Sequence, residues 1–130
     1  MDIAGLEFKT QRAWSAWLKK NHASSEGVWL RIRKKSSSTI SVTYAEALDA
    51  ALCYGWIDAQ KKAGDAETFL QRFTPRGPRS IWSKINREKV LALIEAGRMQ
   101  AAGQAAIDRA KENGNWDAAY DSFKTKTIPL

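Results

Sequence analysis

The feature that most constrains this chain is a repeated change of hydrophobic period between residues 28 and 74. Residues 28–33, "VWLRIR", place apolar side chains at every second position, as a strand with one buried face does. Residues 44–54, "YAEALDAALCY", instead place them at spacings of three and four, which predicts a helix. Strand-like segments return at residues 56–62 and 68–74. This alternation between strand-like and helix-like hydrophobic periods predicts an α+β domain.

The strands are expected to pair as two hairpins. The serine run at residues 36–38 would form the turn of the first, and residues 39–43, "TISVT", would form its return strand. In that strand Ile40 and Val42 would face the core. Gly64–Asp65 would form the turn of the second hairpin. The predicted fold is therefore a small antiparallel sheet of two hairpins packed against several helices.

Helix boundaries are indicated by capping residues. Thr43 and Glu46 have the T-x-x-E spacing of a capping box, and Gly55 is placed to end that helix in a left-handed conformation. A later helix is expected to begin near Ser80 and to end before Gly97. The remaining helices are expected over residues 8–19, 101–113 and 116–123.

The length of 130 residues is sufficient for one domain, residues 1–130, with a core of its own. No stretch reaches the ~18 consecutive apolar residues that can span a bilayer. The N-terminal residues also lack the basic start and long apolar run of a secretory signal, so we expect a cytoplasmic protein. Cys53 is the only cysteine, which excludes an internal disulfide.

The chain carries a formal net charge of +7, which favours anionic partners such as nucleic acid or phosphorylated metabolites. The same charge is also compatible with a basic surface that only keeps the protein in solution. Composition therefore indicates the sign of a partner's charge and leaves its identity open.

Several common kinds of site are excluded by residues that the chain lacks. His22 is the only histidine, so a metal site around it would lack further ligands. Cys53 lies in an apolar helix without a neighbouring base, which is typical of an inert buried thiol. The chain has no G-x-S-x-G, G-x-G-x-x-G or phosphate-loop motif. We predict no metal ion, no cofactor and no catalytic residue.

The first candidate site lies in residues 56–62. An alternating strand would place Trp56, Asp58 and Gln60 on one side, where an aromatic ring, a carboxylate and an amide could line a pocket. The alternative is a strand with one wet face, in which Asp58 pairs across the hairpin with Arg72.

The second and stronger candidate is the segment 72–86, "RFTPRGPRSIWSKIN". Its two prolines and one glycine make a stiff, sharply turning connection between a strand and a helix. A helix N-terminus beside guanidinium groups forms an anion site, and tryptophan can add a stacking surface. The predicted ligand-binding residues are Trp56, Asp58, Arg72, Arg76, Arg79, Ser80, Trp82, Ser83, Lys84 and Asn86.

A purely structural interpretation of this segment is also open. Ser80 would then only cap the helix, and Trp82 and Ile85 would be core anchors. The arginines would bond to carbonyl groups or to Asp58 and Glu67. The direction in which Arg76 and Arg79 point separates the two interpretations.

Two further functions are compatible with the sequence. The protein could bind nucleic acid through a basic strand face and the residues after it, namely Trp29, Arg31, Arg33, Lys34 and Lys35. It could also be an enzyme in which Asp58 acts as a general base beside an arginine-held phosphate, although no second catalytic group is identified.

Several long strings resemble the bacterial YdeI/OmdA-like family, described as bacteriocin-protection, YdeI or OmpD-associated proteins. These strings include "WLKKNHASSEGVWLRIRKK", "VTYAEALDAALCYGWIDAQKK" and "FLQRFTPRGPRSIWSKINREKV", and the resemblance extends over about residues 8–120. It implies a link to resistance against bacteriocins or antimicrobial peptides, without implying a reaction. Longer members continue into a further helical region after the "AY" segment, and we expect that region to be absent here.

Overall fold

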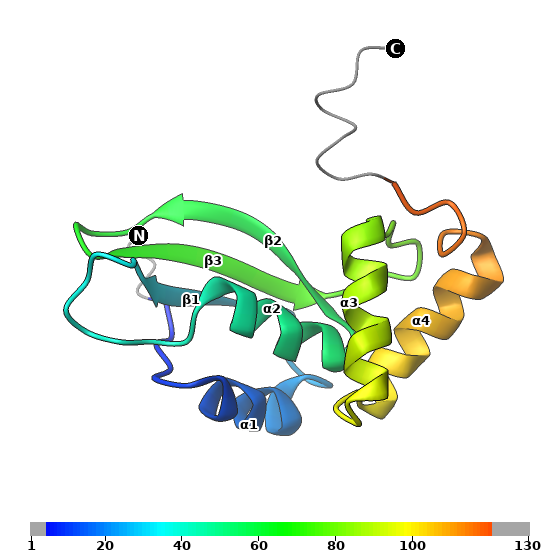
Figure 1. Cartoon of the computed structure of the whole chain (residues 1–130), viewed down its shortest axis with the longest axis horizontal. Coiled ribbons are helices and arrows are strands. Elements are labelled where there is room, and N and C mark those ends of the chain that lie inside the picture. Colours follow the sequence, from blue (N-terminus) through cyan, green and yellow to red (C-terminus); the bar gives the residue numbers. More distant parts are fainter. Residues whose placement is uncertain (1–4, 121–130) are drawn as a thin grey trace, which may run out of the picture.

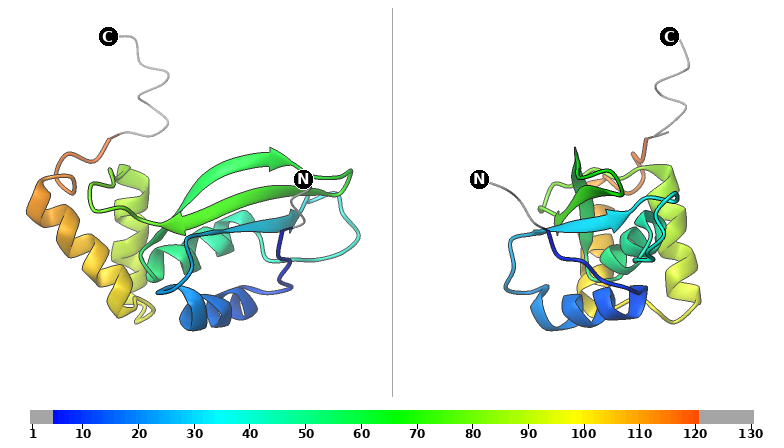
Figure 2. Two further views of the ribbon diagram at one scale, coloured as in Figure 1. Left: turned by 180° about the vertical axis from the view of Figure 1, so that it is seen from behind. Right: turned by 90° about the vertical axis from the view of Figure 1, so that its left-hand side faces the viewer.

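A three-stranded antiparallel sheet forms the centre of the structure, a computed structural model that describes residues 5–120. In chain order the elements are α1 (Gln11–Asn21), β1 (Val28–Arg33), α2 (Tyr44–Cys53), β2 (Trp56–Ala63), β3 (Thr68–Pro75), α3 (Lys84–Glu95) and α4 (Ala101–Asn113). Helices α1 and α2 lie on one face of the sheet, and α3 and α4 stand at the end where β3 finishes (Figures 1 and 2). The predicted α+β class is confirmed.

The strand order is β1-β3-β2, and both outer strands run antiparallel to β3. Strands β1 and β2 are therefore parallel to each other, with β3 inserted between them. The chain crosses from β1 to β2 through α2, which makes a split β-α-β unit. This topology brings the end of β3 beside the start of β2, where the Arg76 amide donates to the Gly55 carbonyl at 2.9 Å.

The predicted hairpin of β2 and β3 is confirmed, and a bulge interrupts its register. Asp58 lies opposite Phe73, but Lys61 lies opposite Gln71, so β2 accommodates one extra residue between these two pairs. Side chains alternate between the two faces of a sheet. The extra residue therefore leaves Asp58 and Lys61 on the same face, which is the face that α1 and α2 cover.

The first predicted hairpin is wrong, because residues 39–43 form no strand. Within this segment Val42 is buried as expected, with 1% of its surface exposed, and its amide donates to the Phe8 carbonyl at 2.9 Å. Ile40 does not face the core, since 81% of its surface is exposed. The segment is a loop that α2 follows, rather than a fourth strand.

Both edges of β1 are already occupied, which explains the missing strand. Strand β3 pairs with one edge. On the other edge the Leu6 amide donates to the Trp29 carbonyl and the Arg31 amide donates to the Leu6 carbonyl, each at 2.8 Å. The Ser41 hydroxyl accepts the next amide, that of Arg33, at 2.9 Å. A return strand would find no free donors here.

Trp14 of α1 joins the helices to the sheet. Its side chain is fully buried, and its indole N–H donates to the Ala47 carbonyl of α2 at 3.0 Å. Its ring lies 5.7 Å from that of Phe73 in β3 and is stacked at 5.5 Å on that of Trp17. The ring of Trp17 in turn meets the edge of Trp56 in β2, so one aromatic cluster links four elements.

Helix α2 forms as its capping residues predict. The Thr43 hydroxyl accepts the Glu46 amide and the Glu46 carboxylate accepts the Thr43 amide, which completes the capping box. Gly55 follows the helix with a φ of +76°, as expected for its end. A Cβ atom at Gly55 would also lie 2.7 Å from the Ala102 carbonyl oxygen, so α4 can approach closely.

Helix α3 begins at Lys84 rather than near Ser80, which corrects the expected boundary. Residues 77–80 form a turn closed by the Ser80 amide and the Gly77 carbonyl at 3.1 Å, and Pro78 occupies its second position. The cap is Ser83, whose hydroxyl accepts the Asn86 amide at 3.1 Å.

The described part of the last predicted helix, residues 116–123, is not helical. The chain turns at residues 114–118, and Tyr120 then forms an isolated bridge with Ser83. The Tyr120 amide donates to the Trp82 carbonyl at 3.0 Å, so its hydrogen bond goes to another segment instead of a helix. Phe123 lies outside the described residues.

Gly103 lets α4 pack directly on the end of α2. A Cβ atom there would overlap the Cys53 carbonyl oxygen and the Met99 sulfur. The Gln100 amide donates to the same Cys53 carbonyl at 3.1 Å. This contact fixes one end of α4 against the sheet and its helices.

The variant Gly103→Ala is expected to lower the free energy of unfolding by about 1–3 kcal/mol, because its methyl group has no space at this contact. Gly77→Ala is the matched control, since nothing lies within 4 Å of its Cβ position and its φ is not positive. Urea unfolding of both variants measures the difference. Equal midpoints would contradict a tight contact between α2 and α4.

Candidate functional site

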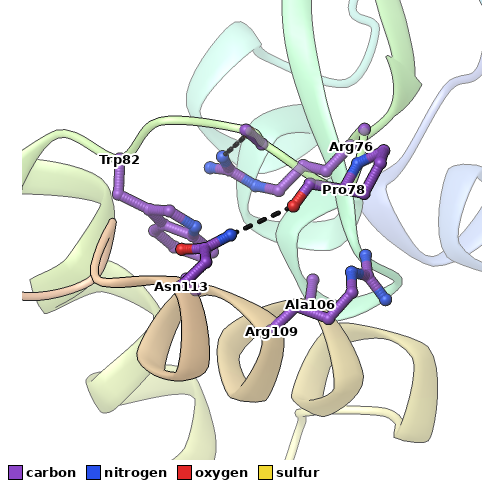
Figure 3. Close-up of a pocket in the computed structure, with 9 residues that line it drawn as sticks. Arg76, Pro78, Trp82, Ala106, Arg109 and Asn113 are labelled. Atoms are coloured by element: carbon purple, nitrogen blue, oxygen red, sulfur yellow. Dashed lines mark hydrogen bonds between the residues drawn. The ribbon is translucent and has the colours of Figure 1, made fainter.

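Arg76 turns inward at the end of β3 and stacks on Trp82. Only 7% of the Arg76 surface is exposed, and its guanidinium carbon lies 3.7 Å from the centroid of the buried Trp82 ring. Figure 3 shows the guanidinium group beside this ring. The stacking is a cation–π contact shielded from water, where such contacts are strongest.

The hydrogen bonds of Arg76 are incomplete among the described residues. Its Nη1 donates to the Ser80 hydroxyl at 2.6 Å and to the Ile81 carbonyl at 3.1 Å. Its Nε and Nη2 atoms are buried and have no hydrogen-bond partner within residues 5–120. A buried guanidinium normally has its N–H groups paired, so these two atoms require an explanation.

Burial lowers the pKa of Arg76 to about 10, and the charges of Asp58 and Tyr120 only partly oppose this effect. The folded protein therefore binds this proton less tightly than the unfolded chain, in which the arginine pKa keeps its higher ordinary value. Stability rises with pH between these two values and carries the full penalty below about 10. The penalty at neutral pH is on the order of 3 kcal/mol.

A narrow gap lies between the segment after β3 and helix α4. Its empty volume is about 170 Å³, but at no point is it wide enough for a water-sized sphere. In Figure 3, Arg109 and Asn113 approach it from α4 and Pro78 from the opposite side. The residues lining the gap are Arg76, Gly77, Pro78, Ser80, Trp82, Ala106, Arg109, Ala110 and Asn113.

Two asparagines hold the gap closed. The Asn113 side-chain amide donates to the Pro78 carbonyl at 3.1 Å. The Asn115 side-chain amide donates to the Arg79 carbonyl at 3.2 Å and the Ser80 carbonyl at 3.1 Å. Since the side chain of Asn113 is exposed, water can replace its bond when the gap opens.

Of the predicted ligand-binding residues, the structure brings Arg76, Ser80 and Trp82 together. Arg79 lies on the exposed outside of the turn and does not line the gap. The two arginines whose directions were in question therefore differ, one pointing into the fold and the other outward.

The start of α3 is not part of this gap. The Ser83 hydroxyl caps the helix by accepting the Asn86 amide, and the Lys84 amide donates to the Tyr120 carbonyl at 2.8 Å. The Ser83 carbonyl also accepts the Arg87 amide. The first-turn donors of Lys84 and Asn86 therefore have protein partners, which removes them from the expected anion site.

The alternative interpretation of this strand, in which Asp58 pairs with Arg72 across the hairpin, is wrong. Asp58 is opposite Phe73, so it lies on the face of the sheet away from Arg72. Its carboxylate accepts the Tyr44 hydroxyl, and burial together with this bond raises the pKa of Tyr44. Arg72 lies 5.8 Å from the ring of Trp29 on the other face.

Trp56 and Gln60 do not form the predicted pocket wall with Asp58. Trp56 is a core residue with 1% of its surface exposed. Gln60 follows Asp58 within the bulge, where strict alternation ends, and is exposed. No side chain of β2 therefore assists the Asp58 carboxylate, which was the candidate general base.

The predicted nucleic-acid residues lie in three different places. The arginines are bound within the fold, because Arg33 pairs with Glu7 at 2.7 Å and Arg31 approaches Asp65 at 3.6 Å. Lys34 and Lys35 are exposed in the loop after β1. Trp29 lies on the face of the sheet opposite the helices, directly across from Arg72.

Arg109 and Asn113 were missed by the sequence interpretation. They come from α4, more than thirty positions after Arg76, and only their spacing of four on one helix face could have linked them to each other. No local pattern indicates that this face meets the turn at residues 77–80.

No group of three or more His, Cys, Asp or Glu side chains among residues 5–120 could hold a metal ion. None of the described helices has the length and apolar character needed to cross a membrane. His22 bonds through its ring nitrogen to the Leu18 carbonyl at 2.8 Å, and Cys53 is buried.

Comparison with known proteins identifies a family without identifying an activity. No curated protein matches the chain. No solved structure matches it either. The resemblance to YdeI/OmdA-like proteins stays a prediction. Residues 6–106, well over half of the chain, match a family model, and the protein therefore belongs to the family described as "Domain of unknown function (DUF8412)".

Proposed function

We propose that this is a cytoplasmic protein that binds a small anionic ligand, through a phosphate or carboxylate group, in the gap beneath Arg76. One observation carries the proposal: a guanidinium group that is more than nine-tenths buried has two nitrogen atoms without partners among the described residues. A buried charge normally has a counter-charge or a full set of hydrogen bonds. An anion would supply both.

The free N–H groups suit an oxyanion. Nε and Nη2 lie on one edge of the guanidinium plane, which is the edge that binds two oxygen atoms of a carboxylate or phosphate side by side. Such a pair would offset the cost of burying the charge and would raise the lowered pKa of Arg76. Arg109 at the gap would add a second positive charge.

Ligand entry requires the gap to widen. The turn at residues 77–80 is held to the end of α4 by the side-chain amides of Asn113 and Asn115. Each such bond contributes only about 0.5–1.5 kcal/mol, so a ligand that binds Arg76 can displace them. The Trp82 ring, which lies under the guanidinium, would keep Arg76 in place during this movement.

A structural role for Arg76 is the competing explanation. Its bonds to Ser80 and Ile81 and its stacking on Trp82 hold the turn in shape. These contacts explain Nη1 and the position of the guanidinium plane. They leave Nε and Nη2 unexplained, which is why we favour a ligand.

Inorganic phosphate is expected to raise the melting temperature of the wild-type protein at constant ionic strength, because it binds the folded state only. The variant Arg76→Met should lose this response. Its own stability should equal or exceed that of the wild type, because a buried charge is replaced by an apolar chain of similar volume. Thermal unfolding followed by circular dichroism measures both effects.

Arg79→Met is the matched control, since it removes the same charge from the exposed side of the same turn. It should retain the phosphate response of the wild type. A response that survives in Arg76→Met would show a general salt effect. A large loss of stability in Arg76→Met, with no phosphate effect on the wild type, would support the structural explanation.

Arg109→Gln is expected to weaken phosphate binding by about three- to tenfold while leaving stability unchanged, because Arg109 is exposed and acts only through its charge. Arg12→Gln removes one charge from the exposed surface of α1 and serves as the control. Titration calorimetry with phosphate compares the two variants. Equal affinities would remove Arg109 from the site.

A further inference from the structure

A second basic region lies at the opposite end of the β2–β3 hairpin. An open hollow of about 580 Å³ lies there, within the range of ligand pockets. Figure 1 shows that the turn end of this hairpin extends beyond α2. The lining residues are Lys34, Lys35, Lys61, Lys62, Ala63 and Phe69.

The floor of the hollow is apolar and aromatic. Phe69 and Ala63 are directly opposite each other in the hairpin, and the ring of Phe69 is only partly buried. The Lys61 ammonium group lies 4.6 Å from the centre of this ring. The bulge in β2 is what turns Lys61 toward Phe69.

Four positive charges surround this floor without neutralisation. All four lysine side chains are exposed, and none forms an ion pair with a carboxylate of residues 5–120. The nearby turn carries two carboxylates: that of Asp65 approaches Arg31, and that of Glu67 accepts the Ser37 hydroxyl, so the four ammonium groups outnumber them. The hollow therefore attracts anions.

Lysines on an edge strand can also simply prevent pairing with other sheets. That role applies to Lys61 and Lys62, which belong to the outer strand β2. It does not explain Lys34 and Lys35, which reach the same hollow from a loop, or the partly buried aromatic ring that lines the hollow with them.

We propose that this hollow binds single-stranded nucleic acid, with a base on Phe69 and the flanking phosphates on the lysines. Each exposed ammonium group binds one phosphate weakly, so a polymer that presents several phosphates is favoured over a single small anion. An aromatic floor with a basic rim is the usual construction of a single-strand site.

A second aromatic ring extends this surface around the edge of the sheet. The Lys62 ammonium group lies 5.0 Å from the ring centre of Trp29, on the face opposite Phe69. Lys61 thus contacts an aromatic ring on one face of the hairpin, and Lys62 contacts another ring on the other face. A strand of several nucleotides can contact both rings, which a mononucleotide cannot.

The test is binding of a fluorescent 12-nucleotide oligo-dT to the full chain, measured by anisotropy over a range of salt concentrations. With four lysines contacting phosphates, log K should fall against log salt with a slope of about −3. Lys61→Glu/Lys62→Glu should lower the affinity at least tenfold. Lys19→Glu/Lys20→Glu, which makes the same charge change at the exposed end of α1, should lower it much less.

Phe69→Leu tests the base contact and should lower affinity about tenfold without reducing the salt slope. Because Phe69 also packs on the core, its variant is compared after thermal unfolding shows that it folds. If the Phe69 variant does not fold, the exposed lysine variants still decide the test. Arg76→Met should bind the oligonucleotide as the wild type does, which separates this site from the phosphate site.

Several outcomes would overturn the inference. These are no binding to oligo-dT, equal affinities of the two double-lysine variants, or equal affinity for a duplex of the same length. Binding to vesicles of anionic lipid with no binding to oligo-dT would assign the hollow to a membrane surface instead.

Discussion

The contact of the Trp14 indole with α2 and β3 is the interaction on which the rest of the structure depends. Its N–H group reaches a helix carbonyl while its ring packs on Phe73 of the central strand. An indole in this position fixes the distance between the helix layer and the sheet. Phe73 lies three residues before Arg76, so this contact holds the part of β3 from which Arg76 leaves the sheet.

The elements predicted from the sequence are those whose determinants are local. The capping box of Thr43 and Glu46 specifies the start of α2, and Gly64–Asp65 specifies the turn of the β2–β3 hairpin. The first hairpin was wrong because Leu6, far from β1 in the sequence, occupies the edge that the return strand needed. Pairing between distant segments leaves no local pattern to detect.

The candidate site shows the same limit. The sequence identified the segment around Arg76 because its prolines, arginines and serines are concentrated there. It could not show that the guanidinium turns inward, since this direction depends on Trp82 and on contacts from α4. Arg109 joins the site only because Gly103 lets α4 pack against α2. It lies beyond residue 106, where the family match ends.

The bulge in β2 decides which side of the sheet each lysine of this strand occupies. If the residues after Asp58 paired one to one with those of β3, Lys61 would lie opposite Leu70 and Lys62 opposite Phe69. The extra residue instead places Lys61 opposite Gln71, on the Phe69 side of the sheet, and Lys62 opposite Leu70, on the Trp29 side. The position of one backbone irregularity, rather than the number of charges, thus determines which ammonium group each aromatic ring receives.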